Sequence, residues 1–232
     1  HSISERWPVN EGWSSTFLCP EKKVAIYGRI KDKSANDCVQ KGMCMNMKYF
    51  AGVLSAGMMA VSALAGGLPV SNLGFEENQV GWEVWGDGDI RQEYHAIKPH
   101  GGANFLRLWS RSGWYQDFPV QANQTLKYSA YVASAKGDGL WGDAFGEVKI
   151  EWRDKSAGDV EVAGKSASTK FDLVGKQDLT IKPDEWTKVS LTGLKAPPKA
   201  THGRLMLTIW TEGADKGGGC ALFDDLEAAV LP

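Results

Sequence analysis

The sequence from residue 66 onward predicts an all-β domain, an antiparallel β-sandwich or jelly roll. Apolar and polar residues alternate with a period of two in short segments, which Gly, Pro, Asn and Asp separate. No segment of this region keeps an apolar face at helical spacing for three turns. The expected strands are Phe105–Ser110, Thr125–Ser134, Glu147–Arg153, Trp186–Thr192, Arg204–Thr211 and Ala221–Val230.

The alternation also assigns the two faces of each strand, because successive side chains point to opposite sides of a sheet. Four strands have one aliphatic face, which we expect to form the core, and one face that mixes aromatic rings with charges. A second apolar layer over the mixed face, or a binding surface, would explain rings such as Trp109, Tyr131 and Trp210. The aliphatic faces are Leu106 and Leu108; Leu126, Tyr128, Ala130 and Val132; Val148, Ile150 and Trp152; and Leu205, Leu207 and Ile209.

Residues 45–65 have the parts of a secretory signal peptide. Lys48 precedes an uncharged run of about 17 residues, which we expect to be helical, and the run closes on Ala63-Leu64-Ala65. A membrane span needs roughly 20 apolar residues, so an uncleaved anchor is the weaker interpretation, and a buried core helix is a third. We therefore expect a secreted protein, extracellular or periplasmic, with no stable membrane span after cleavage.

Residues 1–44 differ from the rest of the chain. They lack strand or helix periodicity, and their cysteines, Cys19, Cys38 and Cys44, have spacings that match no zinc pattern. We interpret this segment as a non-native or disordered leader, with a short extra domain as the alternative. Residues 66–232 then form one domain, in which Cys220 is the single cysteine. An internal disulfide is excluded there, and a buried structural thiol is favoured over a reactive one.

The charge of residues 66–232 argues against some classes of partner. The region holds 18 Lys and Arg against 23 Asp and Glu, a net charge near −5. Nucleic acids and anionic membranes require a basic face, so neither is expected as a partner. Eight of the ten tryptophans also lie in this region. Indole rings stack on the apolar faces of sugars, although a single Trp is more often a core residue, as we expect for Trp152 and Trp186.

Five motifs follow one another along this region. They are Asn72-Leu73-Gly74-Phe75-Glu76-Glu77, Gly113-Trp114-Tyr115-Gln116, Thr125-Leu126-Lys127-Tyr128-Ser129-Ala130, Trp186 with Ala196-Pro197-Pro198, and Phe223-Asp224-Asp225-Leu226. Taken together in their order and spacing, these motifs resemble those of bacterial carbohydrate-binding modules. The group is that of the galactose-binding-like jelly rolls attached to cellulases and xylanases, and the similarity spans roughly residues 70–231.

The resemblance implies a β-sandwich whose first and last segments pair, with a structural Ca²⁺ near their junction. The carried-over ligands are Glu76 and Asp224, or Asp225 in place of Asp224, completed by backbone carbonyls around Gly101 and Gly102. Calcium prefers six to eight oxygen ligands, which such segments can supply. The alternative is that these carboxylates cap or hydrogen-bond the loop backbone.

The resemblance implies a glycan site in one of two places. Members that bind glycan chains use a cleft across the concave sheet, whereas other members of the superfamily bind at loop tips. For loop tips the candidates are Trp82, Trp85, Trp114 and, above all, Trp141. For the cleft, our own assignment from strand parity is Arg107, Trp109, Tyr131, Glu151 and Trp210, with Gln116 nearby.

The sequence favours a binding protein over an enzyme. The three His residues after residue 66 form no metalloprotease motif and accompany no Ser nucleophile motif. Glu151 is the single carboxylate assigned to the mixed face, and glycoside hydrolysis uses a pair. We expect a non-catalytic monomer whose partners are a polysaccharide or oligosaccharide and a glycoside hydrolase domain. The alternatives are a structural or adhesive β-sandwich and a glycoside-cleaving jelly roll.

Overall fold

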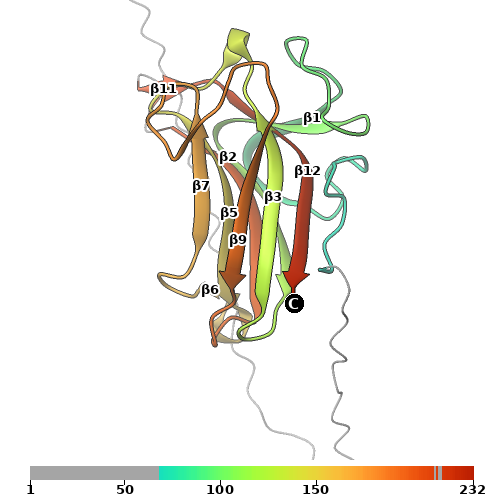
Figure 1. Ribbon diagram of the computed structural model, residues 1–232, viewed down its shortest axis with the longest axis vertical. Helices are drawn as coiled ribbons and strands as arrows, with labels where there is room; N and C mark the ends of the chain where they lie inside the picture. The colour runs from blue at the N-terminus through green and yellow to red at the C-terminus, as the bar shows by residue number, and fades with distance from the viewer. Residues whose placement is uncertain (1–67, 212, 214–215) are drawn as a thin grey trace, which may run out of the picture. The chain divides into compact units, whose positions relative to one another are not determined.

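The described part of the protein is built almost entirely from β-strands (Figure 1). The computed structural model describes residues 68–211, 213 and 216–232, so the leader and signal-peptide predictions lie outside the described residues. Within these ranges no helix has the length and apolarity needed to cross a membrane.

The described chain contains long strands, several strands of two residues and two single-turn 3-10 helices. The elements are β1 (Glu83–Arg91), β2 (Phe105–Pro119), β3 (Thr125–Ala133), η1 (Lys136–Asp138), β4 (Trp141–Gly142), β5 (Phe145–Asp154), η2 (Lys155–Ala157), β6 (Val160–Glu161), β7 (Ala167–Asp172), β8 (Leu179–Thr180), β9 (Thr187–Lys195), β10 (His202–Trp210), β11 (Gly217–Gly218) and β12 (Cys220–Leu231).

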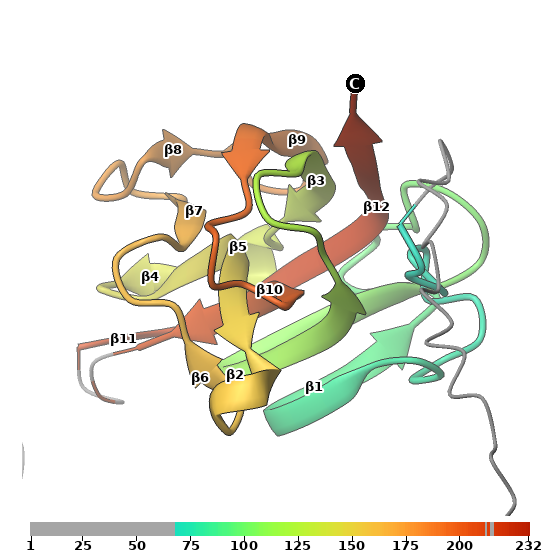
Figure 2. The same ribbon diagram turned by 90° about the horizontal axis from the view of Figure 1, so that it is seen from below.

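One curled sheet forms both layers of the sandwich (Figures 1 and 2). Its strand order is β8-β7-β5-β10-β2-β12-β3-β9, with β1 added to β2 and β6 to β5, and every pair except β7 and β8 is antiparallel. The long strand β2 joins the layers, because Leu106–Trp109 pair with β12 and Ser112–Pro119 pair with β10. The all-β antiparallel jelly-roll sandwich expected from the sequence is thus confirmed.

The predicted aliphatic faces form the core between the layers. All twelve residues assigned to them belong to one buried cluster, and none is more than 1% exposed. Trp152 is among them, as expected. Strand parity predicts these faces correctly because every strand has one side turned toward the opposite layer.

The strand assignments from sequence differ from the structure most at β1, β2 and β7, and they also omit the two-residue strands β4, β6, β8 and β11. The prediction missed β1, which contains Gly86 and Gly88 and lacks apolar alternation, and β7, which is mostly polar. It also ended β2 at Ser110, nine residues early. Ser110 has a φ of 59° and breaks the regular alternation, since this left-handed conformation is rare in extended strands.

A second, smaller apolar cluster covers part of the mixed face. It consists of Ile97, Phe105, Ala133, Ala135, Cys220 and Leu222, and Tyr94, Trp109 and Trp186 pack against it. A second apolar layer therefore explains some of the aromatic residues on that face. The Cys220 thiol is buried there, as expected, and burial raises its pKa to about 12.

Candidate functional site

The residues assigned to one cleft lie on two opposite outer faces of the sandwich. Glu151 and Trp210 face outward from the layer of β5 and β10, whereas Tyr131 faces outward from the layer of β3 and β12. Arg107 and Trp109 belong to the β12-paired half of β2 and share the face of Tyr131. The single-cleft assignment was wrong because β2 passes from one layer to the other, which strand parity cannot reveal.

Gln116 points toward the interior instead of lying beside a cleft. Its side chain is 7% exposed, its Oε1 accepts a hydrogen bond from the Ser71 amide at 2.8 Å, and its Nε2 donates to the Ser71 carbonyl at 3.1 Å. The Gln116 side chain thus makes the two hydrogen bonds with the Ser71 backbone that a neighbouring strand would otherwise make. Its role in the described structure is to hold residue 71 against β2.

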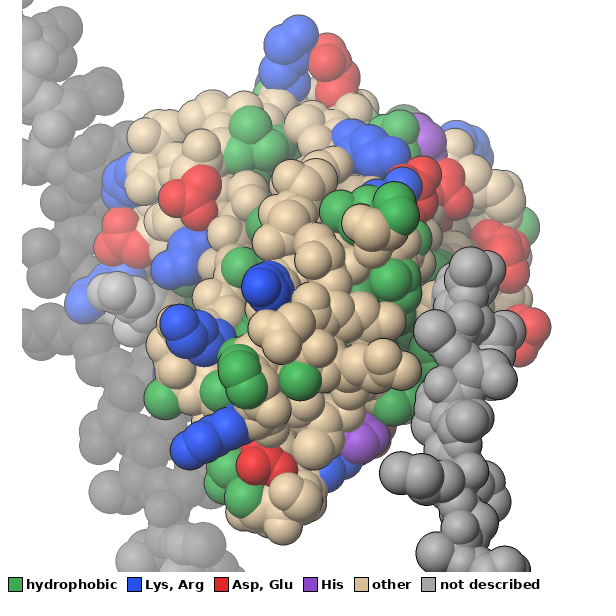
Figure 3. Space-filling model, turned by 60° about the horizontal axis from the view of Figure 1, so that its bottom comes forward, with side chains coloured by type: hydrophobic (Ala, Val, Ile, Leu, Met, Phe, Trp, Pro, Cys, Tyr) green, Lys and Arg blue, Asp and Glu red, His purple; other side chains and the backbone are tan. Residues whose placement is uncertain are grey.

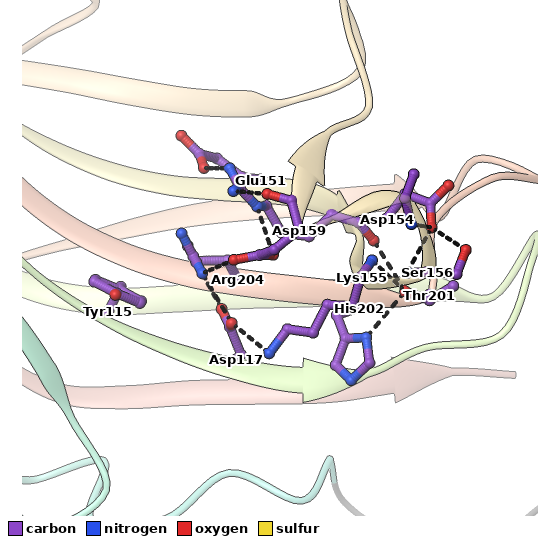
Figure 4. A network of polar contacts seen from close by, with 12 residues as sticks. Tyr115, Asp117, Glu151, Asp154, Lys155, Ser156, Asp159, Thr201, His202 and Arg204 are labelled. Carbon is purple, nitrogen blue, oxygen red and sulfur yellow. Dashed lines mark hydrogen bonds and ion pairs between the residues drawn. The ribbon is translucent and has the colours of Figure 1, made fainter. Parts of the chain in front are cut away.

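An ion-pair network occupies one end of the outer face formed by β2, β5 and β10 (Figure 4). Glu151 pairs with two cations: its Oε1 is 2.6 Å from Lys149 Nζ, and its Oε2 is 3.3 Å from Arg153 Nη1. The other pairs join Arg153 and Arg204 to Asp159, and Arg204 and Lys155 to Asp117. Glu151 is therefore neutralised by two cations and is not a free acceptor for a ligand.

Asp117 and Arg204 form the strongest pair of this network. Two hydrogen bonds of 2.6 and 2.9 Å join the guanidinium to the carboxylate, and the Arg204 guanidinium lies 4.2 Å from the Tyr115 ring centroid. Burial alone would raise the pKa of the Asp117 carboxyl, but hydrogen bonds from Arg204 and Lys155 outweigh burial and lower the pKa to about 2. The charges at this end of the face are therefore paired within the protein.

The other end of the same face carries an aromatic pair. The ring centroids of Trp85 on β1 and Trp210 on β10 are 5.3 Å apart, and the Arg111 guanidinium lies 5.1 Å from the Trp210 ring. Both rings are partly exposed. The sequence places Trp85 only among the loop-tip candidates, because the β1 strand that carries it lacks apolar alternation.

A pocket of about 730 Å³ lies at the end of the sandwich where β11 is labelled in Figure 1. Three of the predicted binding residues, Arg107, Trp109 and Trp141, meet in it, although they come from different parts of the sequence. The described residues that line the pocket are Arg107, Trp109, Ser110, Arg111, Asp138, Trp141, Thr211, Gly213, Gly217, Gly218 and Gly219.

Arg107 is fixed in the pocket wall. Its Nε and Nη2 each donate a hydrogen bond of 3.0 Å to Asp89, and its guanidinium lies 4.5 Å from the Tyr94 ring and 4.4 Å from the Trp109 ring. Tyr94 in turn donates a hydrogen bond of 2.5 Å to Asp138. Burial and this hydrogen bond raise the pKa of Tyr94 to about 12, so it remains a neutral donor.

Trp141 is the most exposed tryptophan among the loop-tip candidates. Its side chain is 50% exposed, whereas Trp82 and Trp114 are 4% and 3% exposed and belong to the core. Trp141 lies in β4, opposite Gly218 of β11, where an added Cβ would come within 3.1 Å of the indole nitrogen. Of these candidates, Trp141 is thus exposed to solvent, whereas Trp82 and Trp114 are buried and their assignment to a loop tip was wrong.

The predicted calcium ligands converge on one loop but accept hydrogen bonds from its amides. Glu76 accepts from Ala103 and Asn104, and Asp224 accepts from His100 and Gly101. Burial raises the pKa of Asp224 to about 6. No group of three or more His, Cys, Asp or Glu side chains within the described ranges could hold a metal ion.

Asp225 and Tyr131 meet at His100, next to this loop. The Asp225 carboxylate lies 2.6 Å from His100 Nδ1, and the His100 ring stacks on Tyr131 at 3.5 Å. Tyr131 therefore has one ring face covered by His100. As arranged, the three carboxylates do not form a cation site, so calcium stays a prediction; bound calcium would make the melting temperature fall on addition of a chelator.

Comparison with known proteins gives a likeness in structure only. No family model and no curated protein matches the sequence. A family 61 carbohydrate-binding module in complex with β-1,4-galactotriose is 14% identical with a TM-score of 0.49, and the match covers 72% of this chain and 100% of that one. Carbohydrate-binding modules are among the structures found.

Two further structures have slightly higher TM-scores. The Stig cyclase Fisc from Fischerella sp. TAU is 16% identical with a TM-score of 0.51, and the match covers 72% of this chain and 98% of that one. Tailspike protein 4 of bacteriophage CBA120 is 11% identical with a TM-score of 0.50, over 71% of this chain and 21% of that one. At these identities the likeness shows the fold alone.

Proposed function

We propose that this protein is a non-catalytic carbohydrate-binding module that binds a polysaccharide or oligosaccharide at the pocket beside Trp141. The observation that carries the proposal is that Arg107, Trp109 and Trp141 meet in one pocket. Its volume lies within the usual range for small-ligand sites, about 300 to 1,000 Å³. A sugar needs an apolar surface for its ring face and directional polar groups for its hydroxyls, and this pocket offers both.

The geometry of the pocket favours binding because Arg107 is held in place before a ligand arrives. Asp89 fixes the plane of the Arg107 guanidinium through two hydrogen bonds. Trp141 is half exposed, so a sugar stacked on it would remove apolar surface from water. A prearranged site loses little conformational entropy on binding.

A binding role also fits the carboxylates near the pocket better than catalysis does. Glycoside hydrolysis uses two carboxyl groups on either side of the scissile bond. Among the described residues that line the pocket, Asp138 is the one carboxylate, and Tyr94 donates a hydrogen bond to it.

We further propose that the module acts outside the cell or in the periplasm, as a monomer, free or joined to a glycoside hydrolase domain. The signal-like segment at residues 45–65 supports this location. The mildly acidic charge of that region argues against a nucleic-acid partner. On the face turned forward in Figure 3, Lys, Arg, Asp and Glu side chains lie interspersed.

Calorimetric titration against soluble glucans, xylans, mannans and galactans tests the proposal. We expect binding to one of these classes, a loss of at least tenfold in affinity for Trp141→Ala, and partial retention for Trp141→Phe, which keeps an aromatic ring. Lys182→Ala, a change on an exposed surface residue, serves as the control. Absence of binding to every glycan, or release of reducing sugar from the panel, would refute the proposal.

A further inference from the structure

The pocket and the Trp85–Trp210 pair are parts of one continuous surface. Arg111 lines the pocket, and its guanidinium also lies 5.1 Å from the Trp210 ring. Thr211, which follows Trp210 directly, lines the pocket as well. A ligand that leaves the pocket past Arg111 therefore meets the aromatic pair.

The aromatic pair is supported by a glycine that leaves room for it. Trp85 on β1 pairs with Gly113 on β2, and a Cβ added to Gly113 would lie 2.7 Å from atoms of the Trp85 indole. The indole thus lies directly against the backbone of the neighbouring strand. Trp210 contacts it at a tilt of 46°, and both rings remain partly exposed. Rings held in this way can stack on a sugar with little loss of side-chain entropy.

The same outer face offers no such surface farther along β10. Arg204 lies over Tyr115 and is bonded to Asp117, and the ion pairs continue to Lys149. A glycan hydroxyl that bound there would have to replace a charge-assisted hydrogen bond already made within the protein. The aromatic surface therefore ends at the network shown in Figure 4.

We infer that this surface binds the end of an oligosaccharide chain, with the terminal sugar in the pocket and the following sugars over Trp210 and Trp85. The inference rests on the proposed function and adds the class of ligand: chain ends longer than one sugar. Arg111 lies between the two parts, and its fork of N–H donors reaches hydroxyls of successive sugars. The ion-pair network limits how many sugars are bound.

The test uses a length series of the glycan class that binds best, from monosaccharide to hexasaccharide. Affinity is expected to rise over the first few sugars and then to level off. Trp85→Ala and Trp210→Ala should weaken binding of the longer oligosaccharides about tenfold and leave the Kd of the shortest ligand within about twofold. Trp141→Ala should weaken binding at every length. Arg111→Ala should reduce the affinity gained with each added sugar. Because the Arg111 side chain is exposed, this change does not require the sheet to repack.

Stoichiometry gives a second readout. A protein that binds chain ends saturates at a fixed number of molecules per glycan chain, whereas a protein that binds along the chain saturates at a number that grows with chain length. Growth of the stoichiometry with length would overturn the inference, as would an unchanged length dependence in Trp85→Ala, Trp210→Ala and Arg111→Ala. Absence of glycan binding at all lengths would instead overturn the proposed function.

Discussion

The partly buried ion pair between Asp117 and Arg204 is expected to contribute measurably to stability at neutral pH. The Asp117 pKa of about 2 is roughly two units below its ordinary value of 3.8. One unit corresponds to about 1.36 kcal/mol, so the lowered pKa corresponds to about 2.4 kcal/mol, and partial exposure of the pair reduces the stabilisation to about 2 kcal/mol. The side chain of Asp117 is 11% exposed, so solvent screens the pair little. Asp117→Asn should lower the free energy of unfolding by this amount at pH 7.

The sign of the pH dependence follows from the lowered pKa. The contribution is complete above pH 3.8, where the unfolded chain is also ionised, and it is lost as the pH falls toward 2. The difference between wild type and Asp117→Asn should therefore shrink between pH 4 and pH 2. Urea unfolding measures it, since urea is uncharged and does not screen ion pairs.

A matched control separates this effect from a general loss of charge. Asp143→Asn removes an exposed ion pair with Lys176 and should leave the unfolding free energy close to that of the wild type. Equal stability of Asp117→Asn and wild type at pH 7 would refute the reasoning. A deficit that stays the same down to pH 2 would refute it as well.

Three further changes test the core and the two parts of the site. Trp152→Ala, at a position 1% exposed, should lower the unfolding free energy by about 3 to 5 kcal/mol in urea titration, and a loss below 1 kcal/mol would contradict its place in the core. Asp89→Asn should weaken glycan binding about tenfold in calorimetry by freeing Arg107, while Asp87→Asn on the same strand should not. Gly113→Ala should displace the Trp85 ring, visible as a changed tryptophan fluorescence spectrum; an unchanged spectrum would contradict the close contact.

The core could be predicted from the sequence, whereas the site could be predicted only in part. Residues such as Leu205 and Leu207 follow a period of two that holds whatever strand lies beside them. The outer faces depend on which layer a strand belongs to, and Ser110, with a φ of 59°, lies where β2 passes from one layer to the other. No sequence period marks that passage.

For a related reason, the sequence predicts individual residues of the pocket but does not predict that they lie together. Arg107, Asp138 and Thr211 are brought together by strand pairing between distant parts of the chain, which composition and local periodicity do not encode. Trp141 could be singled out because it lies in a Gly-rich turn. Such a turn is expected at the surface, where a large apolar ring is exposed to water. Trp85 is named only as a loop-tip candidate, since nothing in its own segment shows that it lies against Gly113 of the following strand.

The position of β2 in both layers also bears on how the chain folds. Its two halves pair with β10 and β12, strands that lie near the end of the sequence. The pairing of β2 is incomplete in both layers until β10 and β12 have been synthesised. The chain must therefore form long-range contacts before it gains most of its stability. Chains dominated by such contacts fold slowly, in milliseconds to seconds. Removal of β12 alone should therefore prevent folding of the whole domain and leave no folded half.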